Sequence, residues 1–110
     1  MTGEPRWVPE AIEDLQSGHD WYDEQEPGLG QQLAAEVFKV LDQVVRHPFV
    51  LKKYEHSNLP AEPEVRKMQV MRFDEYGLVY TVVNDTFWIL AVAHAKRKPG
   101  YWIDRLKKLS

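Results

Sequence analysis

The spacing of the apolar residues changes once along this 110-residue chain, and that change constrains the fold more than any other feature. Before residue 47 apolar residues recur every three or four positions, as in a helix with one buried face. The first stripe is Ile12, Leu15 and then Trp21 or Tyr22, and the second is Leu33, Val37, Phe38, Val40, Leu41, Val44 and Val45. After residue 64 they alternate or run together, which is typical of strands. The sequence therefore predicts helices first and a sheet afterwards.

The ends of the two helices are marked by proline and glycine. Pro9, followed by acidic residues, suits the first turn of a helix, where the macrodipole favours negative charge. The stretch EPGLG breaks this helix near residue 25, and the second helix begins after Gly30. It ends at His47-Pro48, because proline cannot continue it. We expect an antiparallel helical hairpin.

The second half of the chain predicts three strands, at residues 65–73, 78–83 and 87–94. Asn84-Asp85 suits a two-residue hairpin turn, because both residue types tolerate a positive φ. The stretch PRWV before the first helix could add an edge strand, and Tyr101–Leu109 reads as a short final helix. The predicted fold is α+β: an antiparallel sheet of three to four strands, with the helical hairpin packed on one face and a short C-terminal helix.

Alternation along the strands predicts which side chains share a face of the sheet. One predicted file is Arg66, Met68, Val70 and Arg72, and another is Trp88, Leu90, Val92 and His94. The second file places a histidine at the end of a largely apolar row. Trp21 and Tyr22 are expected to pack in the core or against the hairpin, and Trp102 is expected to anchor the last helix.

Composition and charge exclude several classes of protein. With 44% hydrophobic and 28% charged residues the chain reads as globular, as one domain over residues 1–110. No apolar run is long enough to cross a membrane, the N-terminus does not resemble a signal peptide, and cysteine is absent, so we expect a cytoplasmic protein. Residues 1–47 carry ten acidic and three basic side chains, whereas residues 94–110 carry one acidic and six basic side chains. Long-range attraction of nucleic acid to this acidic chain is expected to be poor.

Metal and cofactor sites are not expected. His19, His47 and His56 do not have the spacing of metal ligands, and no cysteine is available. The GLG stretch follows a predicted helix rather than a strand, which is the wrong place for a loop that binds phosphate.

The stretch HAKRKPGYW, residues 94–102, allows two interpretations. It is either a plain strand end followed by a solvated turn, or a basic edge that faces an anionic or protein target. Cleavage of RNA needs a general base, a general acid and cations for the developing charge on the phosphate. Side chains that could supply them are His94, Arg97, Tyr101 and Arg72.

Four stretches, taken in order, resemble the RelE/ParE toxin family of bacterial type II toxin–antitoxin modules. They are WYDEQEPGLG, HP, VRKMQVMRFDEYGLVYTV and LAVAHAKRKPGYW, and the resemblance covers about Trp7 to Leu106. It implies a small cytoplasmic growth inhibitor, of a kind linked to plasmid stabilisation, that a cognate antitoxin neutralises. The antitoxin is expected to bind extended or helical across the sheet and hairpin.

The resemblance leaves two toxic mechanisms open. RelE-like members cut ribosome-bound mRNA, and those members typically have RLVY where this chain has GLVY, so that Gly77 replaces an arginine expected to bind the scissile phosphate. Losing such a donor costs about 3 kcal/mol of transition-state stabilisation. Because of Gly77 and the acidic balance of the whole chain, we expect the ParE-like mode, poisoning of DNA gyrase. The alternatives are a ribosome-dependent ribonuclease with His94, Arg97 and Tyr101 at its centre, and a binding protein that has lost toxicity.

The expected target-binding residues are the basic side chains near this stretch and in the sheet. They are Arg66, Arg72, Lys96, Arg97 and Lys98.

Overall fold

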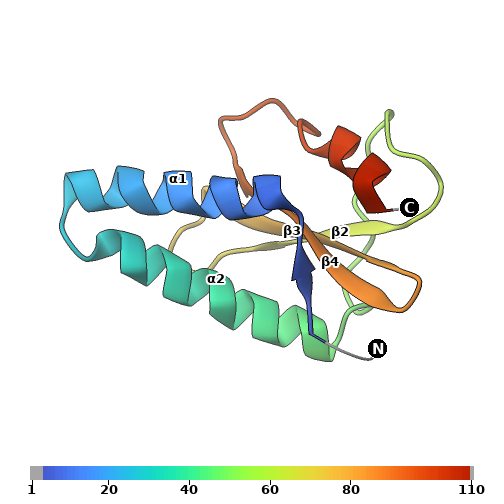
Figure 1. Ribbon diagram of the computed structural model, residues 1–110, viewed down its shortest axis with the longest axis horizontal. Coiled ribbons are helices and arrows are strands. Elements are labelled where there is room, and N and C mark those ends of the chain that lie inside the picture. Colours follow the sequence, from blue (N-terminus) through green and yellow to red (C-terminus); the bar gives the residue numbers. More distant parts are fainter. Residues whose placement is uncertain (1–3, 110) are drawn as a thin grey trace.

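Two antiparallel helices cover one face of a four-stranded sheet in the computed structural model, which describes residues 4–109 (Figure 1). Positions 1–3 and 110 of the expected domain lie outside the described residues. The helices are α1 (Pro9–Gln25) and α2 (Leu29–Arg46), and a short 3-10 helix, η1 (Ile103–Leu109), follows the sheet. The expected α+β class, helical hairpin and C-terminal helix are thus confirmed. The final helix is of the 3-10 type and begins two residues later than expected.

The sheet has the order β1-β4-β3-β2, from β1 (Arg6–Trp7), β2 (Val65–Gln69), β3 (Tyr76–Val83) and β4 (Thr86–His94). The expected edge strand before α1 is present as β1. It pairs parallel to β4, with Arg6 opposite Trp88, so a wholly antiparallel sheet was wrong for this strand. Parallel strands need a long crossover connection, and the helical hairpin provides part of it.

The hairpin between β3 and β4 turns at Asn84 and Asp85, as expected. Their φ values are 50° and 64°, and Val83 pairs with Thr86. Two consecutive positive φ values match the right-handed twist of the flanking strands.

β2 is shorter than expected and ends at Gln69. The chain then turns through Arg72, which has a φ of 69°, and the backbone N–H of Val70 donates to the carbonyl of Tyr76. The predicted file of Arg66, Met68, Val70 and Arg72 therefore stops at Met68. Val70 and Phe73 lie in this turn and are buried. Their apolar side chains therefore continue the sequence pattern of the strand beyond its actual end.

The contact face of α1 differs from the predicted stripe. Ala11 and Gly18 are buried, whereas Ile12 is exposed. A Cβ on Gly18 would lie 2.8 Å from the Tyr76 hydroxyl and 2.9 Å from Leu33, so the helix packs closely through its smallest residues. Trp21 is 55% exposed, so of the two places expected for it the core was wrong, and its ring packs against Tyr22 of the same helix. Tyr22 itself is partly buried against the core, as expected. The stripe of α2 is confirmed at Leu33, Val37, Val40, Leu41 and Val44, while Phe38 is exposed and contacts Trp7.

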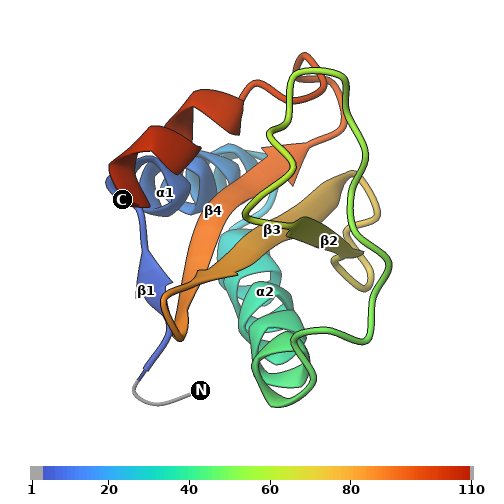
Figure 2. The same cartoon turned by 90° about the vertical axis from the view of Figure 1, so that its right-hand side faces the viewer.

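Trp102 anchors the C-terminal segment as expected. It is 2% exposed, and its ring packs edge-on against Tyr54, with 5.6 Å between the centroids. Tyr54 belongs to the segment between α2 and β2, and its N–H donates to the carbonyl of Val65. Figure 2 shows η1 beside α1, where the Lys108 ammonium donates to Glu10. Within residues 4–109, no helix has both the length and the apolar character to cross a membrane.

Candidate functional site

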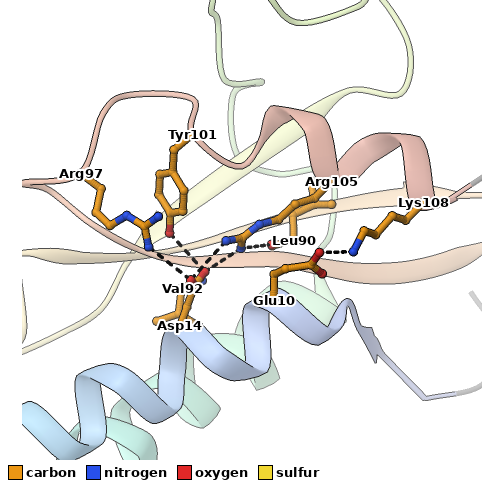
Figure 3. A network of polar contacts seen from close by, with 8 residues as sticks. All are labelled: Glu10, Asp14, Leu90, Val92, Arg97, Tyr101, Arg105 and Lys108. Atoms are coloured by element: carbon orange, nitrogen blue, oxygen red, sulfur yellow. Dashed lines mark hydrogen bonds and ion pairs between the residues drawn. The ribbon is translucent and has the colours of Figure 1, made fainter.

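Asp14 lies at the centre of a network that joins α1, β4 and the C-terminal segment (Figure 3). Its side chain is only 6% exposed. Its carboxylate accepts hydrogen bonds from Arg105, at 2.7 and 3.3 Å, from the Tyr101 hydroxyl at 3.1 Å and from the backbone N–H of Val92 at 3.1 Å. The guanidinium of Arg97 lies 3.7 Å away. The buried charge of Asp14 is therefore paired and hydrogen-bonded, as such a charge must be.

The network closes an open edge of the sheet. β1 pairs with β4 only at Trp88 and Ile89, and the N–H of Val8 continues this edge by donating to the carbonyl of Ile89. Farther along β4, the N–H of Val92 donates to Asp14 and the carbonyl of Leu90 accepts from Arg105 at 2.8 Å. Side chains thus satisfy backbone groups that an edge strand would otherwise expose.

Tyr101 is held between two arginines. The Arg97 guanidinium stacks 3.8 Å from its ring centroid, and the Arg105 guanidinium lies 5.0 Å away. Burial, followed by the nearby charge of Asp14, raises the pKa of Tyr101 to about 12, although both arginines oppose that shift. At neutral pH the hydroxyl therefore stays protonated and donates a hydrogen bond to Asp14.

His94 ends β4 with both ring nitrogens engaged. Its Nε2 lies 3.0 Å from Glu75, and its Nδ1 accepts the backbone N–H of Lys96 at 3.0 Å. The second bond assigns the ring proton of the neutral form to Nε2, which donates to Glu75. The ring also packs edge-on against Tyr76, with 4.8 Å between the centroids. This is the arrangement of a strand-end histidine satisfied by its surroundings.

A cleft of about 370 Å³ brings together four of the residues that the sequence singled out: His94, Lys96, Arg97 and Tyr101. They meet α1 there. The other lining residues are Asp14, Ser17, Gly18, Trp21, Glu75, Tyr76 and Val92.

Arg66 and Arg72 do not line this cleft. Arg66 donates to the carbonyl of Leu51 and to Glu64, each at 2.8 Å, and its side chain is only 12% exposed. Arg72 is exposed and reaches Glu36 of α2 at 3.4 Å. Of the five expected target-binding side chains, Lys96, Arg97 and Lys98 share one loop, and these two arginines lie elsewhere.

Gly77, where the resemblance expects an arginine in ribonucleases, faces the stem of Lys67. A Cβ at this position would come within 2.6 Å of the Lys67 Cε. The ammonium of Lys67 lies 5.8 Å from the ring centroid of Tyr54. The cation beside Gly77 is therefore Lys67 from β2, which is not among the expected target-binding residues.

Asp14 and Arg105 are the main site residues that sequence reasoning missed. They are 91 positions apart, and no local pattern connects them. One signal was present: Asp14 falls on the same helical face as Ala11, Gly18 and Tyr22, so that an acidic residue occupies a position facing inward.

Comparison with known proteins gives one family. A family model described as the ParE toxin of the type II toxin–antitoxin system parDE matches residues 6–99. The match includes the loop with Lys96, Arg97 and Lys98 and stops before Tyr101. No curated protein matches the chain. Among residues 4–109, no group of three or more His, Asp or Glu side chains could hold a metal ion.

Proposed function

Because the chain belongs to the ParE toxin family of type II toxin–antitoxin systems, we propose that it arrests growth by poisoning DNA gyrase, with its loop of Lys96, Arg97 and Lys98 facing the target. Membership of this family implies a toxin with an antitoxin partner. The observation that carries the choice of gyrase over mRNA is the Asp14 network, because it engages the groups that a ribonuclease would use.

Tyr101 is poorly suited to proton transfer at neutral pH. With its pKa raised to about 12 by burial and by the charge of Asp14, it does not act as a base. Its hydroxyl proton is directed at Asp14 rather than at the open side of the cleft. Arg97 is partly engaged too, because its guanidinium stacks on the Tyr101 ring and approaches Asp14.

The cations that an RNA phosphate would need are dispersed. Arg66 is engaged with Glu64 and the carbonyl of Leu51, and Arg72 is paired with Glu36 of α2. Stabilising the charge that develops on a phosphate requires several donors aimed at one point. The exposed loop at residues 96–98 instead offers charge over a surface, which suits contact with a protein.

One observation favours the ribonuclease as a second candidate. His94, Lys96, Arg97 and Tyr101 line one cleft, so that a histidine, a tyrosine and two cations lie within reach of a single ligand. Binding of mRNA on the ribosome would have to release Tyr101 and Arg97 from Asp14 for these groups to act.

The test uses purified chain, DNA gyrase and supercoiled plasmid with ATP. We expect gyrase-dependent double-strand breaks, seen as linear plasmid after denaturation with detergent and protease. Arg97→Ala and Lys98→Ala should reduce the linear product, while Lys52→Ala, in an exposed loop, serves as the control. Tyr101→Phe should leave it unchanged.

A parallel reaction contains ribosomes and mRNA. Codon-phased cleavage that disappears with Tyr101→Phe or His94→Ala, without any gyrase-linked breaks, would establish the ribonuclease instead. Absence of both activities, together with normal growth at high expression, would mean a fold that binds a partner without toxicity.

A further inference from the structure

The cleft of about 370 Å³ has features that the proposed target contact does not use. It lies between the central part of α1, from Asp14 to Trp21, and the end of β4 with the loop that follows. Buried Tyr76 and Val92 contribute an apolar surface, and exposed Trp21 and Lys96 line it as well. Such a mixture of apolar surface with a few polar groups is typical of a binding site.

Trp21 is an exposed aromatic side chain with firm support. Its indole packs edge-on against Tyr22, with 5.0 Å between the centroids, and Tyr22 packs in the same way on Phe73 at 5.1 Å. More than half of Trp21 is exposed. Aromatic side chains held in this way are common at the centres of protein interfaces, because they bury much apolar area at little entropic cost.

The charges in the cleft leave an excess of one positive unit. Asp14 is neutralised by Arg105, which leaves Glu75 against Lys96 and Arg97. Within residues 4–109 the ammonium of Lys96 has no side-chain partner. One carboxylate would balance this excess. A polyphosphate would bring more negative charge than the cleft neutralises, next to Glu75.

A partner strand cannot extend the sheet at this place without breaking existing bonds. The N–H of Val92 and the carbonyl of Leu90 already pair with Asp14 and Arg105. Addition of a strand needs free backbone groups on the edge. A partner that binds here would therefore have to contact the cleft through its side chains.

From these features we infer that the cleft holds a short acidic segment of the antitoxin, with one large apolar side chain against Trp21 and one carboxylate on Lys96. The inference rests on the proposed function, because the antitoxin is the partner of a toxin. Occupation of the cleft would cover part of the loop at residues 96–98 and so exclude the target from it.

The experiment is calorimetric titration of the full chain with its cognate antitoxin. Trp21→Ala and Lys96→Glu are each expected to raise the dissociation constant at least tenfold. The matched controls are Ile12→Ala, on the exposed side of the same helix, and Lys52→Glu, in the exposed loop before β2. Both controls should stay within twofold of the wild type, and circular dichroism should show that every variant is folded.

Two results would overturn the inference. One is wild-type affinity, within twofold, for both Trp21→Ala and Lys96→Glu. The other is displacement of the antitoxin by micromolar ATP, since that would mean a polyphosphate site.

A growth assay separates this inference from the proposed function. If Trp21→Ala arrests growth but the antitoxin no longer rescues the cells, both stand. If the wild type arrests no growth and breaks no DNA with gyrase, the proposed function fails, while the calorimetric comparison still decides whether the cleft binds the partner.

Discussion

The buried charge of Asp14 has its main partner, Arg105, near the other end of the chain. Arg105 should therefore matter more to stability than Arg97. Arg105 is 12% exposed and donates to both Asp14 and the carbonyl of Leu90, whereas Arg97 is 53% exposed. Removing one partner of a buried pair costs about 3 kcal/mol, and an exposed pair contributes less than about 1 kcal/mol. We expect Arg105→Ala to lower the free energy of unfolding by about 3 kcal/mol. Urea denaturation of both variants measures this, and equal losses for Arg97→Ala and Arg105→Ala would contradict it.

Tyr101 should make stability sensitive to alkaline pH. Its pKa is about 12 in the folded chain and about 10 when unfolded. The folded state therefore holds this proton more tightly, so its contribution is complete below pH 10 and is lost as the pH rises toward 12. Between pH 9 and 11.5 the urea midpoint of the wild type should fall more than that of Tyr101→Phe, which lacks the ionisable group. The difference between the two chains isolates Tyr101 from the other tyrosines, and parallel curves would count against the raised pKa.

At the scale of elements, two tryptophans that the sequence treats alike have opposite roles. Trp102 is 2% exposed and packs on Tyr54, which ties the C-terminal segment to the loop before β2. Trp21 stands on the surface of α1. We expect Trp102→Ala to cost about 3 kcal/mol or more of unfolding free energy, because it leaves a large cavity. Trp21→Ala should cost less than about 1 kcal/mol. Thermal melts followed by circular dichroism would show this, and similar losses for both variants would refute it.

The sequence predicted most elements because their signals are local. The stripe from Leu33 to Val44, the turn at Asn84-Asp85 and the strand ending at His94 each follow from residues close together in the chain. The parallel pairing of β1 and the early end of β2 depend on tertiary contacts, so propensity does not reveal them. The exposure of Trp21 has the same origin: α1 packs through Ala11 and Gly18, and a helix with such a face turns its larger residues outward.

The candidate site was only partly predictable for the same reason. His94, Lys96, Arg97 and Tyr101 were found because they are neighbours in one stretch, and the structure places them along one cleft. Asp14, which determines what Tyr101 and Arg97 can do, comes from a helix about 80 residues earlier. The local pattern places Asp14 on the inward face of its helix, but nothing local in the sequence pairs it with Tyr101 or Arg97.

At the scale of the whole molecule, acidic side chains neutralise most of the positive charge of the C-terminal stretch. Arg105 pairs with Asp14, Lys108 with Glu10 and Lys107 with Asp104. Within this stretch, the exposed excess of positive charge lies in the loop at residues 96–98, on a chain with a net charge of -3. Such a protein by itself is expected to bind DNA weakly, because affinity for the phosphate backbone depends on how many phosphates the protein neutralises.

We therefore expect the chain alone to bind duplex DNA or single-stranded RNA only weakly, with a dissociation constant above about 100 µM at 150 mM salt. Fluorescence anisotropy with labelled 30-mers measures this. A double variant, Glu13→Lys with Glu24→Lys, is the control, because it reverses two exposed charges of α1 and should tighten binding without touching the loop. The affinity of this variant should fall steeply with added salt, because its lysines displace counterions from the phosphates of the nucleic acid. Micromolar binding of the RNA by the wild type, but not of the DNA, would mean that the chain recognises RNA directly, and it would favour RNA over gyrase as the target.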